Sequence, residues 1–158
     1  MSEQTILAAV DGRGVATITL DRAQVHNAMN GAMLAGLADA ITGFEADPDI
    51  RLLVLRGAGK SFSAGADMSG QDNEPKPSLP EAINCLANFT RPTMALVQGA
   101  AFGGGSGLVP ACDVVLAATS AQFALTEVKL GLVPAMISPF VIDAIGARQA
   151  RRYFQTAE

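Results

Sequence analysis

Two glycine-rich segments of this sequence have the composition needed to bind a ligand through bare backbone. The first is Phe-Ser-Ala-Gly-Ala-Asp at residues 62–67, and the second is Gln-Gly-Ala-Ala-Phe-Gly-Gly-Gly at residues 98–105. Each follows an expected β-strand and precedes an expected helix start, where free N–H groups point toward negative charge. Glycine and alanine also let a ligand approach the backbone closely. Two such N–H groups that converge on one carbonyl oxygen would form an oxyanion hole, whereas the simpler alternative is a pair of ordinary tight turns.

Other catalytic patterns fail at single positions. The Gly-Lys-Ser run at residues 59–61 resembles the end of a phosphate-binding loop, but such a loop requires glycine at the position of Val54. The second glycine segment has Leu108 where the dinucleotide-binding pattern requires its third glycine. His26 is the only histidine, so we expect no metal site built from several histidines. No Gly-x-Ser-x-Gly turn offers a nucleophilic serine.

The elements that must position these segments alternate between strands and helices, which predicts an α/β fold. Apolar residues recur at helical spacing after Asn30, which has the type of a helix N-cap, namely Met33, Leu34, Leu37, Ile41 and Phe44. An Asp-Gly-Arg-Gly turn predicts that the first two strands form a hairpin. The expected strands cover residues 6–10, 15–20, 51–56, 93–97 and 114–117, further helices cover 81–88 and parts of 134–158, and the proline-rich residues 69–80 form a mobile loop.

Composition excludes several classes of protein. The chain has 158 residues, which fits one domain over residues 1–158, and 49% of them are hydrophobic. A net charge of −4 argues against a non-specific nucleic-acid binder. The uncharged stretch 92–112 contains five glycines and two prolines, with turn residues in its middle, so we expect no membrane span. With no secretory pattern at the start and two cysteines in apolar surroundings, Cys85 and Cys112, we expect a cytoplasmic protein with reduced thiols.

With their flanks, the two glycine segments resemble the signatures of the crotonase (enoyl-CoA hydratase/isomerase) superfamily. Residues 56–67 resemble the first signature, and residues 98–105 with 111–113 resemble the second. Residues 20–29 resemble the turn that contacts CoA in the family, and residues 123–134 resemble the segment that carries a catalytic glutamate. Ala23 stands where that turn usually has proline. The resemblance implies an α/β fold of the ClpP/crotonase type with a ββα spiral core. Residues 137–153 look most like a bacterial branch that includes methylglutaconyl-CoA and isohexenylglutaconyl-CoA hydratases.

The resemblance implies a role for each matching residue. The N–H groups of Ala66 and Gly104 would bind the thioester oxygen of an acyl-CoA, and Glu127 would transfer protons. Water addition to an unsaturated thioester passes through an enolate with its charge on that oxygen, and one fixed donor there typically lowers the barrier by about 2.7–4 kcal/mol. No cofactor is implied, since CoA carries the substrate. The residues implied to contact CoA are His26, Ala64, Gly65, Asp67 and Met68, with Arg22 and Lys60 as phosphate candidates.

Each of these roles has a simpler alternative. On composition alone, Glu127 is a surface or capping residue, and the charged side chains of Arg22, His26 and Lys60 are equally well explained as solvated surface charges. A glutamate in an apolar stretch is nevertheless costly to bury without a role or a partner.

The sequence departs from the family at a second carboxylate. Typical hydratases have a glutamate just after the glycine triplet, and Gly107 stands at that position. The leading hypothesis is a hydratase acting on a branched or carboxylated enoyl-CoA, and the alternative is a Δ3,Δ2-enoyl-CoA isomerase that works with one glutamate.

A third hypothesis is a CoA-binding fragment without turnover, because family members normally continue beyond the position of Glu158 into helices. We expect those C-terminal helices to be missing or truncated. An apolar stripe at Ala150, Tyr153, Phe154 and Ala157 would then lie uncovered, which predicts a homo-oligomer, a trimer or a dimer of trimers if the full fold forms.

Overall fold

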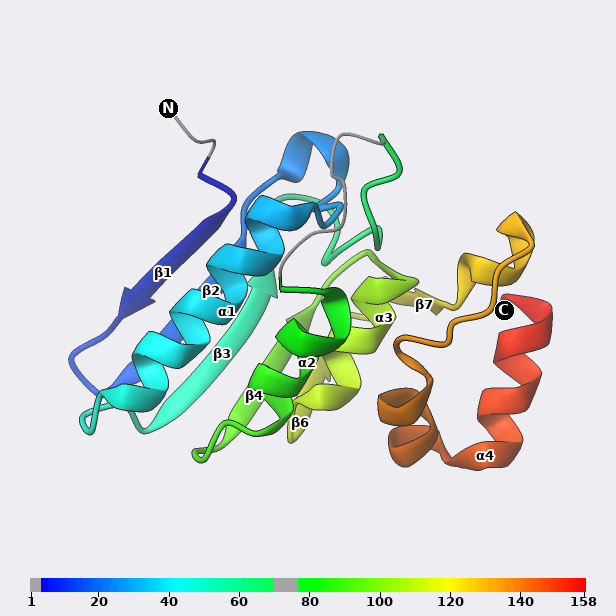
Figure 1. Cartoon of the computed structure of the whole chain (residues 1–158). Coiled ribbons are helices and arrows are strands. Elements are labelled where there is room, and N and C mark those ends of the chain that lie inside the picture. Colours follow the sequence, from blue (N-terminus) through cyan, green and yellow to red (C-terminus); the bar gives the residue numbers. More distant parts are fainter. Residues whose placement is uncertain (1–3, 70–76) are drawn as a thin grey trace.

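A five-stranded sheet runs through the molecule, with its strands in the order β1-β2-β3-β4-β6 (Figure 1). The structure is a computed structural model that describes residues 4–69 and 77–158. Most of the expected loop 69–80 lies outside the described residues, so its predicted mobility stays a prediction. The strands of the sheet are β1 (Ile6–Val10), β2 (Val15–Leu20), β3 (Leu52–Gly57), β4 (Thr93–Val97) and β6 (Val114–Ala117).

The register of this sheet brings three loops to one edge. β1 and β2 form the predicted antiparallel hairpin, and β2, β3, β4 and β6 then pair in parallel. Leu20 pairs with Gly57, and Arg56 pairs with Leu96, so β2, β3 and β4 end at the same edge. The loops that leave these ends contain the residues with predicted roles, as is usual for parallel α/β sheets.

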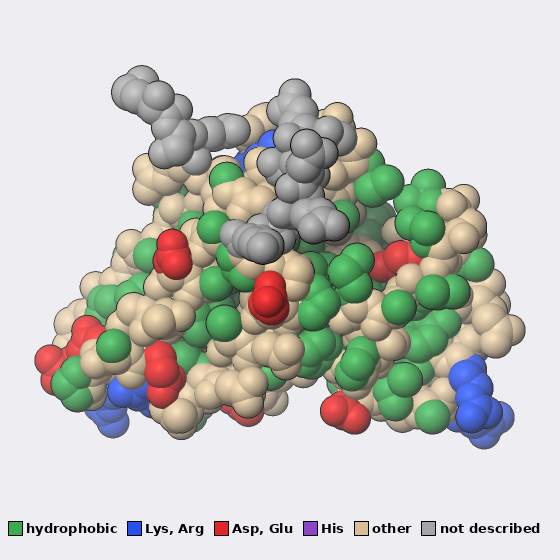
Figure 2. All heavy atoms as spheres, viewed as in Figure 1, with side chains coloured by type: hydrophobic (Ala, Val, Ile, Leu, Met, Phe, Trp, Pro, Cys, Tyr) green, Lys and Arg blue, Asp and Glu red, His purple; other side chains and the backbone are tan. Residues whose placement is uncertain are grey.

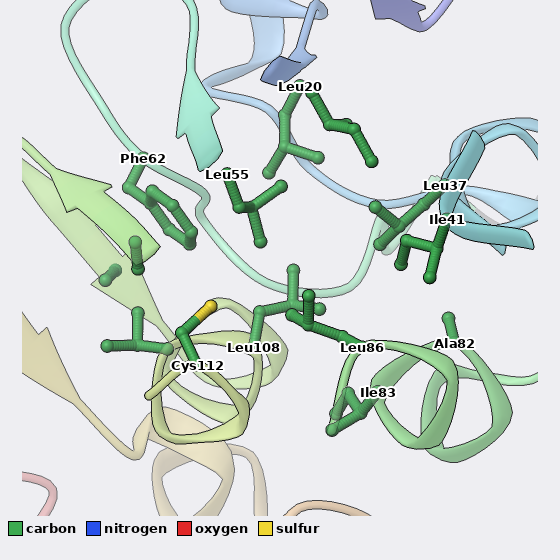
Figure 3. Close-up of a cluster of buried hydrophobic side chains, with 14 of the residues drawn as sticks. Leu20, Leu37, Ile41, Leu55, Phe62, Ala82, Ile83, Leu86, Leu108 and Cys112 are labelled. Atoms are coloured by element: carbon green, nitrogen blue, oxygen red, sulfur yellow. The ribbon is translucent and has the colours of Figure 1, made fainter. Parts of the chain in front are cut away.

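Two helices cover one face of the sheet, α1 (Gly31–Ala46) and α2 (Leu79–Ala87) (Figure 1). The Asn30 side chain accepts a hydrogen bond from the Met33 N–H at 2.9 Å, which confirms the predicted N-cap. The predicted apolar face of α1 is buried at its first four residues, and Phe44 is half-buried against the core. Figure 3 shows Leu37 and Ile41 of this face together with Leu20 and Leu55 from the strands, Ile83 from α2 and Leu108 from α3.

A small second sheet was not predicted. It pairs β5 (Ala100–Phe102) with β7 (Gln122–Ala124) in parallel, and α3 (Gly104–Leu108) begins directly after β5. The second glycine segment is therefore a strand, a turn and a helix start. The expected helix start after the first glycine segment is wrong. Ala66 instead forms a parallel bridge with Met29, which keeps the backbone extended there.

Three short 3₁₀ helices and one long α-helix complete the described part of the chain. The 3₁₀ helices are η1 (Ala23–Val25), η2 (Val109–Ala111) and η3 (Thr126–Leu130), of which η1 lies earlier in the chain. The long helix α4 (Ser138–Thr156) is interrupted at Gly146, whose φ is +77°. Within the described residues, no helix combines the length and apolar character needed to cross a membrane.

The expectation of an uncovered apolar stripe on the last helix is wrong. Ala150 is fully buried and Ala157 is 6% exposed. Tyr153 and Phe154 are half-buried and pack against the hydrophobic core. The break at Gly146 turns the second half of α4 to run in a different direction from the first (Figure 1). The apolar side chains of the stripe are therefore covered by other residues of the same chain.

Candidate active site

Backbone hydrogen bonds join the two glycine segments directly. The Phe62 N–H donates to the Gln98 carbonyl at 2.8 Å, and the Ser63 N–H donates to the Ala100 carbonyl at 3.0 Å. In return, the Phe102 N–H donates to the Ser63 carbonyl at 2.9 Å. This short parallel ladder holds the two segments side by side, although they are separated by more than thirty residues in the sequence.

The N–H groups of Ala66 and Gly104 remain free in this arrangement. The two residues that flank Ala66 both bond to Met29, since its N–H donates to Gly65 and its carbonyl accepts from Asp67. Gly104 is the first residue of α3, where helix N–H groups have no intrahelical acceptor. Among the described residues, neither the Ala66 nor the Gly104 N–H donates a hydrogen bond.

Gly65 allows the two N–H groups to lie close together. Its φ is +96°, and a Cβ built on it would lie 2.8 Å from the Phe102 oxygen and 3.4 Å from the Gly104 nitrogen. Any larger residue would therefore push the two segments apart. Gly104 is itself covered by Met29 and Leu79, whose side-chain carbons lie 2.8 and 2.7 Å from its hypothetical Cβ. The pair of turns thus has the composition of an oxyanion hole, and Gly65 lets the first turn approach the Gly104 nitrogen closely.

Glu127 brings a carboxylate to the same place. It lies in η3, and its Oε1 is 3.2 Å from the position that a Cβ on Gly103 would occupy. The Gly103–Gly104 peptide is the one that carries the second free N–H. The Glu127 Oε2 is buried and has no hydrogen-bond partner in the described part of the chain. A buried carboxylate oxygen without a donor requires an explanation, and a role in binding or moving a proton provides one.

Four of the predicted CoA-contact residues lie at the exposed rim of the first glycine segment. His26, Ala64 and Met68 are exposed, as is the phosphate candidate Lys60. The His26 Nδ1 lies 3.1 Å from the Ser61 Oγ, and the His26 carbonyl accepts a hydrogen bond from the Ala64 N–H. The structure therefore places His26 beside Ser61 and Ala64, and the contact of these residues with CoA stays a prediction.

Arg22 and Asp67 pair with each other. The Arg22 Nη1 lies 2.7 Å from the Asp67 Oδ2, and only 11% and 15% of the two side chains is exposed. The Arg22 side chain and the Ser69 N–H both donate to Asp67, which holds the pKa of its carboxyl below the ordinary value. Both residues were assigned to CoA by resemblance, and the structure gives their charged groups an internal partner that the sequence did not indicate.

Asn27 is a residue of the site that the sequence analysis did not single out. It is fully buried, with a φ of +55°. Its side chain accepts from the Arg22 N–H and donates to the carbonyls of Ala58, Ser61 and Phe62, all between 2.9 and 3.1 Å. Asn27 therefore ties the end of β2 to the loop after β3. The one signal in the sequence was its place between His26 and Ala28 in the CoA-contacting motif.

The position of the missing second carboxylate has no room for a side chain. A Cβ on Gly107 would lie 2.4 Å from the Ile137 Cγ2 and 3.2 Å from the Ile83 Cδ1. Ile137 is 1% exposed. Glycine is thus required here by close packing between α3 and the segment that leads into α4, and the place of an acid is taken by a hydrocarbon side chain.

A separate cavity of about 600 Å³ lies between α3, β7 and α4. Its walls are mainly apolar and include Val115, Leu125, Val141 and Tyr153. None of the predicted site residues lines it, so the cavity is distinct from the pair of free N–H groups. Among the described residues, no group of three histidine, cysteine, aspartate or glutamate side chains is placed to hold a metal ion.

Comparison with known proteins shows the family of the chain. The sequence profile of the enoyl-CoA hydratase/isomerase family matches residues 11–158. A 1,2-epoxyphenylacetyl-CoA isomerase of Escherichia coli is 34% identical over 154 residues, covering 90% of this chain and 58% of that protein. A hydroxycinnamoyl-CoA hydratase-lyase of Pseudomonas fluorescens is 32% identical over 158 residues, covering 92% of this chain and 57% of that protein.

Solved structures give the same result. The crystal structure of an enoyl-CoA hydratase from Shewanella pealeana superposes with a TM-score of 0.90 at 40% identity, covering 99% of this chain and 63% of that chain. The chain belongs to the enoyl-CoA hydratase/isomerase family, and its α/β fold is the crotonase fold that the motifs predicted. It spans between 50% and 61% of the length of the curated relatives it matches.

Proposed function

We propose that this chain binds an α,β-unsaturated acyl-CoA and stabilises the enolate formed from its thioester. One observation carries the proposal: two free N–H groups, on Ala66 and Gly104, lie on adjacent turns beside the carboxylate of Glu127. As the enolate forms, negative charge moves onto the thioester oxygen, and fixed N–H donors bind that charge more strongly than they bind the neutral carbonyl.

Hydration is the leading reaction. The carboxylate of Glu127 would accept a proton from water as the oxygen adds to the β-carbon, which leaves the enolate bound to the two N–H groups. The same carboxyl would then return a proton to the α-carbon, so that the net change is the addition of one water molecule. No cofactor takes part in this scheme. The likeness of residues 137–153 to the branch of glutaconyl-type hydratases supports a branched or carboxylated acyl group.

Isomerisation of a 3-enoyl-CoA is the alternative reaction. Here Glu127 would remove a proton from the α-carbon and return it to the γ-carbon, which moves the double bond into conjugation with the thioester. The close contact between Gly107 and Ile137 favours this alternative, because it leaves no place for a second carboxylate at that position. A chain that binds acyl-CoA without turnover is the third outcome, since this chain spans only part of its relatives' length.

Replacement of Glu127 by glutamine tests the proposal. The variant keeps the shape of the side chain and removes its ability to transfer protons, so kcat is expected to fall by about 10²–10⁴-fold while acyl-CoA binding is retained. Assays with a 2-enoyl-CoA and a 3-enoyl-CoA measure hydration and isomerisation separately. The Glu45→Gln variant, whose half-buried carboxylate pairs with Arg91, is the control and should retain wild-type turnover. Unchanged turnover in Glu127→Gln would contradict the catalytic role.

We also propose that the chain associates with copies of itself, as a trimer or a dimer of trimers, and that it is cytoplasmic. The exposed apolar side chains of β6, including Val114, Val115 and Leu116, support association. Light scattering over a dilution series tests it, and a monomer at micromolar concentration would contradict it. The two free cysteines agree with a reducing compartment.

A further inference from the structure

The Ala66 N–H has its direction fixed by its neighbours. The Gly65 carbonyl and the Asp67 N–H both bond to Met29, at 2.7 and 2.9 Å. Ala66 is therefore held at two points by the backbone of another segment, and its N–H faces away from that segment. Any movement of Met29 and its neighbours relative to Asp67 would turn the Ala66 peptide.

One nitrogen atom of Arg22 connects the two segments at this point. Its Nη1 donates to the Ala28 carbonyl at 2.6 Å and to the Asp67 Oδ2 at 2.7 Å. Ala28 precedes Met29, and Asp67 follows Ala66. The guanidinium therefore joins Ala28 to Asp67, directly beside the backbone bridge between Met29 and Ala66. Its side chain and that of Asp67 are largely buried, and an ion pair withdrawn from water is less screened than an exposed one.

The base of Arg22 is also fixed. The backbone N–H of Arg22 donates to the side chain of Asn27 at 2.9 Å, and the Asn27 side chain donates in turn to three carbonyls of the loop after β3. The charged end of Arg22 therefore acts from a rigid base rather than from a mobile loop. Both hydrogen-bond acceptors of the Arg22 Nη1 belong to this chain, so this atom binds within the protein and not to solvent.

We propose that Arg22 and Asp67 are positioning residues, whose ion pair aims the Ala66 N–H at the thioester oxygen. This inference rests on the proposed function, because it assigns a purpose to the direction of a donor that the proposed reaction uses. Neither side chain needs to touch the substrate. A displaced donor loses much of its effect, since catalytic groups about 1 Å from their proper place can cost about 10²-fold in rate.

The test uses Arg22→Met and Asp67→Asn, with 4-(dimethylamino)cinnamoyl-CoA as a chromophoric probe. Hydrogen bonds to the thioester oxygen polarise the conjugated system and shift its absorbance to longer wavelength, which reports on the donors without turnover. We expect the bound probe to shift in the wild-type protein and to shift much less in Arg22→Met. The kcat of Arg22→Met should fall by about 10²-fold with KM changed much less.

Further variants separate positioning from a role in folding alone. Arg22→Lys places one cation with several donors where Nη1 lies, so it should recover most of the shift and of kcat. The double variant Arg22→Met/Asp67→Asn should be no worse than Arg22→Met, because the two side chains act as a pair. The exposed pair of Arg13 with Asp11 provides the control, and Arg13→Met should leave both readouts unchanged. Circular dichroism verifies that each variant is folded.

The outcomes distinguish the two proposals. If the wild-type protein fails to bind the probe, or binds it without a shift, the proposed function is overturned and the positioning role with it. If the wild-type shift persists in folded Arg22→Met and Asp67→Asn, the positioning role alone is overturned. If Arg22→Met does not fold, a full absorbance shift and full kcat in Asp67→Asn would likewise overturn the positioning role alone.

Discussion

The segments that carry the two free N–H groups and the segment that carries Glu127 are stabilised in opposite ways. The first are joined by buried polar groups, including Asn27 and Ser63, which are both fully buried and hydrogen-bonded. The second follows β7 and leaves large apolar side chains in contact with solvent, with Leu130 at 61% and Val133 at 77% exposure. Figure 2 shows hydrophobic side chains gathered over the part of the molecule where Figure 1 places β7 and α4.

This difference divides the candidate site into a polar half, which carries the two free N–H groups, and an apolar half, which carries Glu127. The distance between the donors on Ala66 and Gly104 is determined by hydrogen bonds within the folded core of this chain. The position of the Glu127 carboxylate depends on η3, which lies among exposed apolar residues. Hydrophobic packing contributes roughly 25 cal/mol per Å² of apolar surface removed from water, so a segment with uncovered apolar side chains gains less of it. The donor pair is therefore the more rigid half.

The largest effect is expected for Asn27→Ala, which would disrupt the polar half. The variant removes four hydrogen bonds and leaves the Arg22 N–H and three carbonyls without their partner. Unfolding free energy should fall by about 3–4 kcal/mol, since each unsatisfied buried group costs about 1–3 kcal/mol and part of the loss is relieved by relaxation. Urea unfolding measures it. The exposed Asn88→Ala is the control, and an equal loss in both variants would show that burial is not the cause.

A smaller effect is expected for Gly107→Ala, at the contact between the two halves. Its new methyl group would lie 2.4 Å from the Ile137 Cγ2, so overpacking should lower the unfolding free energy by about 1–3 kcal/mol. Thermal or urea unfolding would measure this change. The matched control is Gly43→Ala in α1, where a Cβ meets no atom within 4 Å and the change should stabilise by about 0.5–1 kcal/mol. A stabilising Gly107→Ala would mean that Ile137 yields freely and that the halves are not tightly joined.

The smallest effect on stability is expected for Leu116→Lys, in the apolar half. Leu116 is 55% exposed on β6, so unfolding free energy should change by less than about 0.5 kcal/mol. Association should weaken, because a lysine on an edge strand opposes docking of another chain. Light scattering measures the mass of the particle. Leu7→Lys on β1, the opposite edge strand, is the control, and the comparison fails if both variants change association equally.

Local patterns were sufficient for the elements with a strong period or a strong turn. β1, β2, β4 and β6 lie at their predicted residues because apolar runs are bounded there by glycine, proline or aspartate. The strands β5 and β7 have only three residues each, too few to show alternation. The helix start after Asp67 was wrong because the bridge between Met29 and Ala66, which no local signal predicts, keeps the backbone extended.

The candidate site was predictable only where a motif carried it. Resemblance pointed to Ala66, Gly104 and Glu127, which the fold brings into the same region. The pairing of Arg22 with Asp67 joins residues 45 positions apart, and nothing in a single sequence links two such charges. The contact of Ile137 with Gly107 depends on how the segment before α4 returns to α3, and this is a property of the tertiary fold alone.

The strand order of the main sheet has a consequence for how the chain can assemble. Its strands lie side by side in the order in which they occur in the sequence, β1, β2, β3, β4 and β6. Each new strand therefore pairs with a strand that precedes it in the sequence and has already been synthesised. No later strand has to insert between two earlier ones. Since connections that close short stretches of chain lose less entropy than those that close long ones, growth of the sheet from its N-terminal hairpin meets no large entropic step.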